Sequence, residues 1–569
     1  MGERKTYIIN IDGMRADYFC AVGHQGCLTP TLLSLAEAGV RFSNCKSIMP
    51  ANTGTNHVAI MTSTHASSHG ILGIGGYYQG LDFDHFRLSR KYGIAKANLY
   101  EHRHLQVPTF FNIIKSQDPD LCTAFIPGKT WLGRIIPDED CDITIYPGNN
   151  EDNCGEHKPN PSYTTISEGY VLGGLAHPED NEIFPRVYIP EKDATDFKAP
   201  IGTVGLSAID FDADKLPSDK WIIDQAIKCV DNDNPDFMYI ILMNMDLAGH
   251  GYGSFMVREN PDETKNKNLN MLRNPNATKD QLYITDQEIK RFIDHLKNKG
   301  LFDDSRIIIT SDHGMNTMKT MFSEKSRRNI LLWILEKLNL FRTPNYVPFI
   351  PPEFTEKLYI DIRQILSDNG IYMRASPDKL LCRYNPKGDY DWCISEGPNG
   401  YIFNASPQVQ RKIKDTLTGY TIVEDGKTIY PIWKVLIEDE QNDSINEYTG
   451  KPFKLGKGDF LDVIWPSVIV FLKPHYMIPL YHDQLVSGLT PIMLKMRLPG
   501  FLDIRTAPGA HGTFLEQDVP LIFTSINEVE VPSNTLYKKQ VSVLDIIPTI
   551  NHLNGWKKQS SFEGISLFS

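Results

Sequence analysis

The most regular pattern in the chain is a set of short apolar runs, each followed at once by polar side chains that can take part in chemistry. Four such runs lead into Asp12, Gly128, Asp246 and Asp312. The runs are nearly continuous rather than alternating, which is typical of strands buried on both faces of a parallel sheet. We therefore expect these four runs to be strands of one such sheet.

Helical patterns lie between these runs. The segment 29–39 has leucines at helical spacing and ends at a glycine. In the segment 278–300, Thr278 and Gln281 predict a capping box and Gly300 predicts the helix stop. Strands alternating with helices predict an α/β fold with a doubly wound, mostly parallel sheet flanked by helices. In such sheets ligands bind beyond the carboxyl ends of the strands, where the polar side chains fall.

The alternation of strands and helices breaks after residue 314, which predicts an inserted domain. We expect an α/β core made of 1–324 and 501–569, and an inserted α+β cap at 325–500. A stretch rich in Pro, Asn, Asp and Gly at about 145–200 predicts an irregular excursion from the core. Within the cap, the pattern predicts a helix at 326–341, a strand followed by a helix within 399–417, and a hairpin within 425–437.

Composition and charge mainly exclude certain classes of protein. The 569 residues are 41% hydrophobic and 22% charged, which is ordinary for a globular protein with a sizeable core. A net charge of -12 argues against a nucleic-acid-binding surface, so an anionic substrate must be attracted by local charge. We see no secretory leader, no apolar run long enough for a transmembrane segment, and no CxxC pair among the nine cysteines. These features favour a cytoplasmic protein.

Three carboxylates and three imidazoles follow the predicted strands or lie in the closing part of the core. They are Asp12, Asp246, His250, Asp312, His313 and His511. Such groups are the ligands that hold two divalent transition metals in proteins. Two divalent ions among three carboxylates leave a small positive charge, which attracts an anion. A metal pair can hold the attacking and leaving oxygens of an in-line phosphoryl displacement.

The polar stretch 47–63 leads into an apolar helical pattern and offers a nucleophile for this centre. A threonine at the start of that helix can direct its oxygen at the metals, while the free backbone N–H groups of the first turn face a phosphate. Thr53 and Thr55 both satisfy this description, and spacing alone does not choose between them.

Five segments occur in the order NIDGMRADYF, PANTGTNHVAIMTSTHASSHGI, MDLAGHGYG, SDHGM and GAHGT. Together they resemble the motifs of the alkaline phosphatase superfamily, most closely its nucleotide pyrophosphatase/phosphodiesterase branch. The resemblance covers the core and not the cap. It implies an alkaline phosphatase-like fold and hydrolysis of phosphate diesters. It also implies two divalent metal ions, zinc before manganese or iron, and a threonine that is phosphorylated during the reaction.

The resemblance also assigns individual residues. It implies a first metal site formed by Asp12, Thr53, Asp312 and His313. It implies a second metal site formed by Asp246, His250 and His511. The TxxNH pattern selects Thr53 over Thr55 as the nucleophile. The same pattern implies that Asn56 donates a hydrogen bond to a phosphate oxygen.

Two differences from the nucleotide pyrophosphatase/phosphodiesterase branch leave the identity of the substrate undecided. Gly54 stands where nucleotide-cleaving members usually carry an aromatic residue beside the base, so a nucleotide substrate is not implied. The segments 125–134 and 217–240 are similar to phosphonoacetate hydrolase, which cleaves a carbon–phosphorus bond, and Lys129 matches its substrate-binding lysine. A phosphonate hydrolase and a phosphomonoesterase are therefore the alternatives. The monoesterases carry an arginine on the nucleophile helix, which 53–63 lacks.

Other interpretations are weaker. A sulfatase needs a CxPxR-type signature, and Cys45 does not begin one. A metal-free binding protein would not need all six ligands and a hydroxyl. We interpret His57, His65 and His69 as packing residues. The predicted partner is a small phosphate ester or phosphonate. We expect the cap helix around Trp333 to be buried or to face a second copy in a homodimer.

Overall fold

The computed structural model describes thirteen stretches of the chain, and every structural statement below refers to them. The predicted helix at 326–341, almost all of the predicted excursion at 145–200, and the predicted cap boundaries at 325 and 500 lie outside the described residues. The described stretches are 4–23, 26–73, 77–78, 102–129, 132–136, 141–145, 219–255, 275–318, 360–374, 387–424, 426–458, 463–478 and 509–568.

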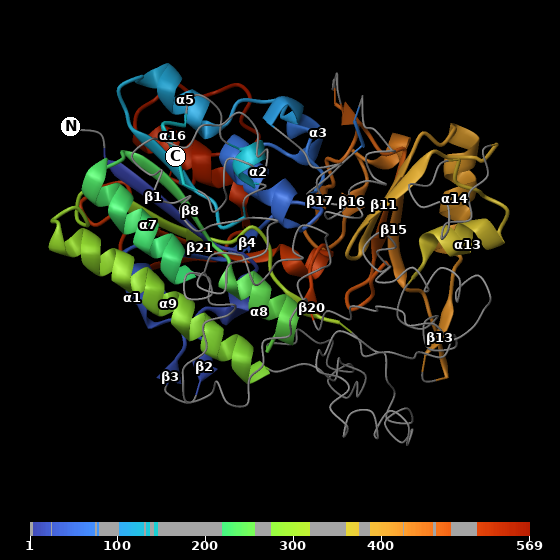
Figure 1. The fold of residues 1–569 in the computed structure, drawn as a ribbon, viewed down its shortest axis with the longest axis horizontal. Coiled ribbons are helices and arrows are strands. Elements are labelled where there is room, and N and C mark those ends of the chain that lie inside the picture. Colours follow the sequence, from blue (N-terminus) through green and yellow to red (C-terminus); the bar gives the residue numbers. More distant parts are fainter. Residues whose placement is uncertain are drawn as a thin grey trace, which may run out of the picture.

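A nine-stranded sheet forms the centre of the molecule (Figure 1). Its strand order is β22-β4-β21-β9-β1-β8-β6-β7, and β23 also pairs with β4. Among the described strands, neighbours run parallel except at β21, which is antiparallel to β4 and β9. The prediction of a mostly parallel sheet is confirmed. The strands are β1 (Lys5–Ile11), β4 (Val40–Lys46), β6 (Thr123–Ile126), β7 (Ile143–Thr144), β8 (Phe237–Leu242), β9 (Ser305–Thr310), β21 (Asp518–Thr524), β22 (Thr535–Tyr537) and β23 (Val541–Ser542).

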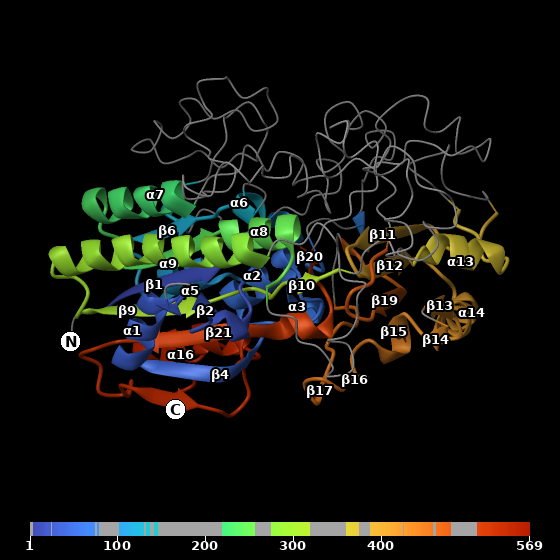
Figure 2. The ribbon, with the colours of Figure 1, turned by 90° about the horizontal axis from the view of Figure 1, so that it is seen from below.

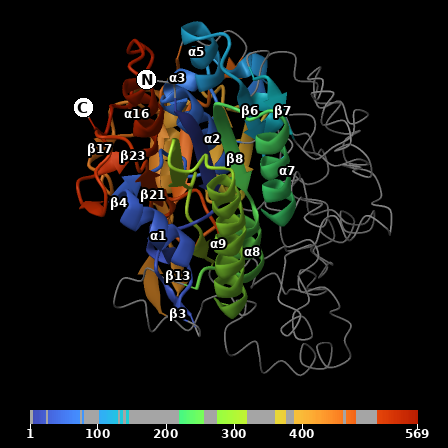
Figure 3. The ribbon, with the colours of Figure 1, turned by 90° about the vertical axis from the view of Figure 1, so that its left-hand side faces the viewer.

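Helices cover both faces of this sheet (Figures 1 and 3). Successive side chains of a strand point to opposite faces. In β1, Ile9 belongs to the apolar cluster under α1, α7 and α9, and Ile8 belongs to the cluster under α2, α5 and α16. The doubly wound arrangement is therefore confirmed. The helices are α1 (Pro30–Ala38), α2 (Thr53–Thr62), α5 (Phe110–Gln117), α7 (Asp219–Asn232), α9 (Pro275–Asn298) and α16 (Ile546–Leu553).

Shorter elements complete the core. They are η1 (Ala16–Tyr18), β2 (Val22–Gly23), β3 (Gly26–Cys27), α3 (Ala66–His69), β5 (Tyr77–Tyr78), η3 (His102–His104), α6 (Leu132–Ile135), α8 (Asn244–Tyr252), β10 (Asn316–Thr317), β20 (Gly509–Ala510), η9 (Phe514–Gln517) and η10 (Val543–Asp545).

The predicted start of α9 is wrong, although its predicted end is confirmed. The helix begins at Pro275, because proline is well suited to the first helical turn. Thr278 therefore lies inside the first turn, where its hydroxyl donates to the carbonyl of Gly253 at 2.8 Å. Gly300, with φ +69°, follows the helix end as expected.

The second unit is a four-stranded antiparallel sheet with two helices, seen to the right of the core in Figure 1. The predicted strand and helix within 399–417 are confirmed as β12 and α14. The hairpin predicted within 425–437 is wrong in its pairing, because the turn at Gly426 joins β13 to β14 and β15 pairs with β19 instead. The elements are α13 (Ile362–Asp368), β11 (Trp392–Glu396), β12 (Asn399–Phe403), α14 (Pro407–Thr418), β13 (Ile422–Glu424), β14 (Lys427–Ile429), β15 (Ile432–Ile437), η8 (Glu438–Glu440), β16 (Ile445–Asn446), β17 (Lys451–Pro452), β18 (Val463–Ile464) and β19 (Val468–Leu472).

The antiparallel unit joins the core through two neighbouring strands. Asn316 and Thr317 of β10 pair with Ala510 and Gly509 of β20. The chain therefore leaves and re-enters the core at adjacent positions (Figure 2). We propose that the cap is inserted between β10 and β20. Among the helices in the described part of the chain, none combines the length and apolar character needed to cross a membrane.

Candidate active site

The predicted metal ligands meet at one edge of the central sheet. β8, β1 and β9 are parallel neighbours, so their carboxyl ends lie side by side. Asp12 follows β1, and Asp312 with His313 follows β9. Asp246 lies in the first turn of α8, directly after β8, and His250 follows four residues later on the same helical face. His511 enters from β20, far away in the sequence.

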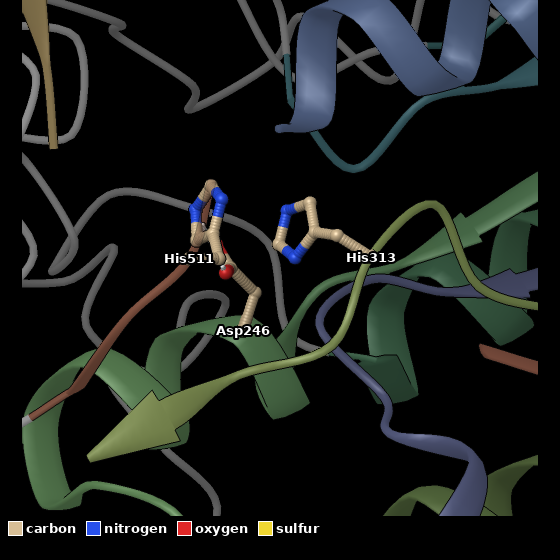
Figure 4. A group of neighbouring side chains, drawn as sticks. All are labelled: Asp246, His313 and His511. Atoms are coloured by element: carbon tan, nitrogen blue, oxygen red, sulfur yellow. Dashed lines mark ion pairs between the residues drawn. The ribbon is translucent and has the colours of Figure 1, made fainter. Parts of the chain in front are cut away.

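Two groups of three side chains bring their donor atoms within 4.8 Å of one another. One group is Asp12, Asp312 and His313, and the other is Asp246, His313 and His511 (Figure 4). His313 therefore stands between the groups, with its ring stacked 3.6 Å from that of His511. The resemblance implied a different division of the ligands, in which the second group was Asp246, His250 and His511. His250 Nε2 lies 3.4 Å from Asp246 Oδ1, within reach of that group.

The donor atoms fit divalent metal ions. In the described part of the chain, both carboxylate oxygens of Asp12 and one oxygen each of Asp246 and Asp312 are buried and accept no hydrogen bond, which is costly unless a cation binds there. Each imidazole uses Nδ1 to donate to a backbone carbonyl, so its Nε2 is left to bind a metal. These bonds join His250 to Gly509 at 3.0 Å, His313 to Gly314 at 2.9 Å and His511 to Ala51 at 3.2 Å.

The electrostatic environment agrees with this chemistry. Burial lowers the pKa of His313 to about 3 and that of His511 well below its usual value, so both rings are neutral, as metal ligands must be. Burial, reinforced by the charge of Asp12, raises the pKa of Asp312 well above its usual range. Burial acts most strongly on Asp246 and by itself would raise its pKa, but Lys129 and the neighbouring imidazoles of His250, His511 and His313 together outweigh burial and lower that pKa.

Thr53 is the first residue of α2 and is buried beside both donor groups. Its Oγ1 lies 3.0 Å from His313 Nε2. The preceding residue, Asn52, caps the helix by accepting a hydrogen bond from the Thr55 N–H at 3.1 Å. Thr55 Oγ1 is buried without a hydrogen-bond partner among the described residues. Of the two threonines, Thr53 is the one that contacts a predicted ligand.

The structure also brings Lys129 to this group. Its ammonium lies 2.8 Å from Asp246 Oδ2, 3.0 Å from Asp12 Oδ2 and 3.3 Å from Thr53 Oγ1. The side chain reaches there because Lys129 lies three residues after the end of β6, the next strand beyond β8 in the sheet. Lys129 is itself buried, so its charge is balanced by these carboxylates.

Asn56 does not contact the donor groups as expected. Its Oδ1 accepts a hydrogen bond from the Ile48 N–H at 2.8 Å. Its Nδ2 donates to the carbonyls of Ile48, Pro50 and Asn52 at 3.2, 3.0 and 3.1 Å. The buried amide is therefore fully used in holding the segment that leads into α2. We correct the assignment of Asn56 as a phosphate ligand on this ground.

His57 was interpreted as a packing residue, yet it touches the site. Its Nε2 lies 3.4 Å from Asp312 Oδ2 and 3.7 Å from Asp12 Oδ2. Its Nδ1 makes a 2.6 Å hydrogen bond with the Tyr239 hydroxyl. A sequence signal was available, because a residue four positions after Thr53 shares its helical face.

The fold and the site together define an α/β protein with an alkaline phosphatase-like core. Residues 6–339 match the type I phosphodiesterase / nucleotide pyrophosphatase family, and the chain belongs to this family. Its members are metal-dependent hydrolases of phosphodiester and pyrophosphate bonds. The resemblance seen in the sequence motifs is confirmed.

Individual relatives are distant. An uncharacterized pyrophosphatase/phosphodiesterase of Schizosaccharomyces pombe is 22% identical over 339 residues, which are 59% of this chain and 48% of that protein. The match thus spans about half of that relative. Inactive murine ectonucleotide pyrophosphatase/phosphodiesterase 5 in complex with AMP has a TM-score of 0.51 at 13% identity, covering 98% of this chain and 96% of that one. Phosphonoacetate hydrolase from Sinorhizobium meliloti with phosphonoformate has a TM-score of 0.49 at 15% identity, covering 97% and 96%.

Proposed function

We propose that this protein is a phosphodiesterase with Thr53 as its nucleophile. The observation that carries the proposal is the position of the buried Thr53 hydroxyl. It contacts His313 at 3.0 Å and Lys129 at 3.3 Å, at the start of a helix and between two groups of metal-binding side chains. A hydroxyl needs such surroundings to act as a nucleophile near neutral pH.

The metal sites follow from the same geometry. We assign Asp12, Asp312 and His313 to one divalent ion and Asp246, His250 and His511 to the other, with zinc the best match for these nitrogen and oxygen donors. Manganese and iron accept the same donors. Bound there, the two ions supply the Lewis acidity that lowers the pKa of the hydroxyl and neutralises charge on the phosphate.

The chain's own groups carry out the remaining steps. Thr53 gives up its hydroxyl proton, its oxygen attacks phosphorus in line, and the bond from phosphorus to the leaving oxygen breaks, with one proton taken up by that oxygen as the alcohol departs. The Lys129 ammonium donates to the Thr53 oxygen, and backbone N–H groups of the first turn of α2 donate to the non-bridging oxygens. The intermediate is a phosphodiester between Thr53 and the remaining alcohol of the substrate, and water then hydrolyses its bond to Thr53, which releases the phosphate monoester and restores the hydroxyl.

The residues of the nucleophile helix favour diesters over monoesters as substrates. The nucleophile helix, from Thr53 to Thr62, carries no arginine that would bind the extra charge of a monoester. Gly54 offers no ring on which a nucleobase can stack, so the proposal covers small phosphate diesters and names no nucleotide.

A substrate panel tests the proposal. Purified protein, stripped of metal and then supplied with zinc, is assayed on bis-p-nitrophenyl phosphate, p-nitrophenyl phosphate, a nucleotide 5′-ester and phosphonoacetate. We expect zinc-dependent hydrolysis of the diester, two bound ions per chain by elemental analysis, and a loss of at least about a thousandfold in Thr53→Ala. Wild-type enzyme trapped during hydrolysis of bis-p-nitrophenyl phosphate should carry a p-nitrophenyl phosphoryl group on Thr53 by mass spectrometry.

The same panel can contradict the proposal in separate ways. Faster hydrolysis of the monoester would reject the diesterase assignment. Full activity in Thr53→Ala would reject the nucleophile. A chain that binds no metal and hydrolyses none of the four compounds would be a binding protein with an enzyme's fold.

Phosphonate hydrolysis is the second candidate, and the position of Lys129 favours it. A buried ammonium beside the nucleophile can bind the carboxylate of phosphonoacetate, which a simple diester lacks. Turnover of phosphonoacetate alone in the panel would select this alternative, and Lys129→Met should then raise KM for phosphonoacetate.

A further inference from the structure

A turn of the cap lies against the candidate active site. It comprises residues 396–399, between β11 and β12, and Glu396 pairs with Asn399 in the antiparallel register. The turn is held in place by its own backbone. The carbonyl of Gly397 accepts from the Ile478 N–H at 2.9 Å, and that of Pro398 accepts from the Leu472 N–H at 3.0 Å. Its position is therefore set by the cap sheet.

The turn touches the segment that carries the nucleophile. The Asn52 side chain uses its oxygen to cap α2, and its Nδ2 donates to Glu396 Oε2 at 3.2 Å. A Cβ atom on Gly73 would overlap the Glu396 carboxylate, so a glycine is needed there to admit it. The Glu396 carboxylate thus reaches the residue directly before Thr53.

The same turn also touches the segment that carries His511. A Cβ atom on Gly512 would come within 2.6 Å of Asn399 Nδ2, and one on Gly397 would come within 3.2 Å of the His511 carbonyl. The turn therefore contacts both the segment before Thr53 and the segment around His511. A charge on this turn therefore exerts an electrostatic force on any ligand that binds beside Thr53.

We infer that Glu396 determines the preference of this site between phosphate diesters and monoesters. The inference rests on the proposed function. A diester carries one negative charge, whereas a monoester carries close to two above its second pKa of about 6. Metal ions and the α2 N-terminus attract both substrates, but a carboxylate at this place opposes the second charge of the monoester. The Glu396 charge thereby disfavours monoesters further, in addition to the absence of an arginine on the nucleophile helix.

The substitution Glu396→Gln tests the effect of the Glu396 charge separately from the shape of the side chain. Glutamine keeps an oxygen to accept from Asn52 Nδ2, and the net charge of the turn rises by one whatever other groups surround it. At about pH 8 and low ionic strength, we expect kcat/KM for p-nitrophenyl phosphate to rise about three- to tenfold relative to that for bis-p-nitrophenyl phosphate. Inorganic phosphate should inhibit the variant more strongly by a similar factor.

Two variants serve as controls. Glu396→Asp keeps the charge and should keep the wild-type ratio. Glu447→Gln makes the same charge change elsewhere in the cap, at a side chain that is 60% exposed and paired with Lys434, and should leave the ratio unchanged. If Glu396→Gln fails to fold, Gly73→Ala replaces it, because the added methyl group displaces the carboxylate and should shift the ratio in the same direction.

The outcomes separate this inference from the proposed function. An unchanged ratio, or an equal loss on both esters, would overturn the inference and leave Glu396 with a structural role at Asn52. A wild-type protein that hydrolyses neither ester would overturn the proposed function itself, and the inference with it.

Discussion

At the scale of single residues, the site depends on groups that orient the predicted ligands. His57 is buried between the Tyr239 hydroxyl and the carboxylate of Asp312. Burial lowers the pKa of His57 and raises that of Tyr239, so the ring is neutral and the phenol keeps its proton. When the phenol donates to Nδ1, the proton of His57 lies on Nε2 and faces the carboxylates. Tyr239 thus fixes the tautomer that holds Asp12 and Asp312 in place.

The first prediction concerns this tyrosine. Tyr239→Phe should weaken metal affinity about ten- to a hundredfold, because groups behind the ligands typically have effects of that size. Activity should return at high zinc concentration, which a zinc titration monitored by activity and by elemental analysis would reveal. Tyr7→Phe is the matched control, since Tyr7 is equally buried and its hydroxyl has no hydrogen-bond partner in the described residues. Equal zinc affinity in the two variants would refute the role of Tyr239.

Single residues also show where the sequence was informative. The acids and imidazoles were recognisable because each follows a strand or sits in a short motif. The roles given to Asn56 and His57 did not take account of their hydrogen-bond partners. The amide of Asn56 meets backbone groups of 48–52, and the ring of His57 meets Tyr239 on a strand far away in the sequence. Sequence spacing does not encode the contact between His57 and Tyr239, which are far apart in the chain.

At the scale of elements, the Asn56 side chain makes several of the hydrogen bonds that hold the segment before α2. Asn56 makes four hydrogen bonds to Ile48, Pro50 and Asn52, all of them buried. Asn56→Ala would remove the hydrogen bonds of the Ile48 N–H and carbonyl, and one of the two bonds accepted by each of the Pro50 and Asn52 carbonyls. We expect the free energy of unfolding to fall by about 2–4 kcal/mol, measured by denaturant titration.

This change should leave the KM of the folded fraction unaltered, which separates a structural role from substrate binding. Asn527→Ala, at an exposed asparagine whose amide bonds only the Asp303 carbonyl at 3.1 Å, should cost less than about 0.5 kcal/mol. A raised KM in Asn56→Ala without a loss of stability would restore the phosphate-binding assignment.

Elements differ in how far the sequence predicts them. The four central strands were predictable because burial on both faces leaves continuous apolar runs. The start of α9 was missed because Thr278 and Gln281 imitate a cap, while Pro275 marks the true start. The pairing of β15 with β19 was missed because a turn at Gly426 gives no information on which distant strand lies alongside β15.

At the scale of the whole molecule, the break in the strand–helix alternation predicts an inserted cap, but it does not predict the contact between the antiparallel unit and the site. The turn 396–399 reaches Asn52 and Gly512 only because β11 and β12 extend from the cap sheet toward the core. Apolar side chains of both units form one continuous cluster. Such packing depends on shape across hundreds of residues, which local patterns leave undetermined.

The C-terminal segment is hydrogen-bonded to the residues that follow the nucleophile helix α2. The Glu563 N–H donates to the carbonyl of Ser63, directly after α2, at 2.8 Å. The Glu563 carboxylate accepts hydrogen bonds from His65 and Ser68. Although burial opposes ionisation, these bonds lower the pKa of Glu563 to about 2. An acid whose pKa falls on folding stabilises the protein above its unfolded pKa, about 4.3 for glutamate, and this contribution disappears as the pH falls through the folded pKa.

Glu563→Gln should therefore lower the free energy of unfolding at pH 7 by about 1–3 kcal/mol, the range for a charge-assisted hydrogen bond in a partly buried place. The difference from wild type should stay constant down to about pH 5 and then shrink between about pH 4 and pH 2. Denaturant titrations of both proteins across this range measure it. Glu530→Gln removes a more exposed glutamate that pairs with His552 at 3.5 Å, and should cost less than about 1 kcal/mol. If the Glu563→Gln difference grew as the pH fell, the carboxylate would not be held ionised by these bonds, and the C-terminal segment would be anchored to α2 by its backbone alone.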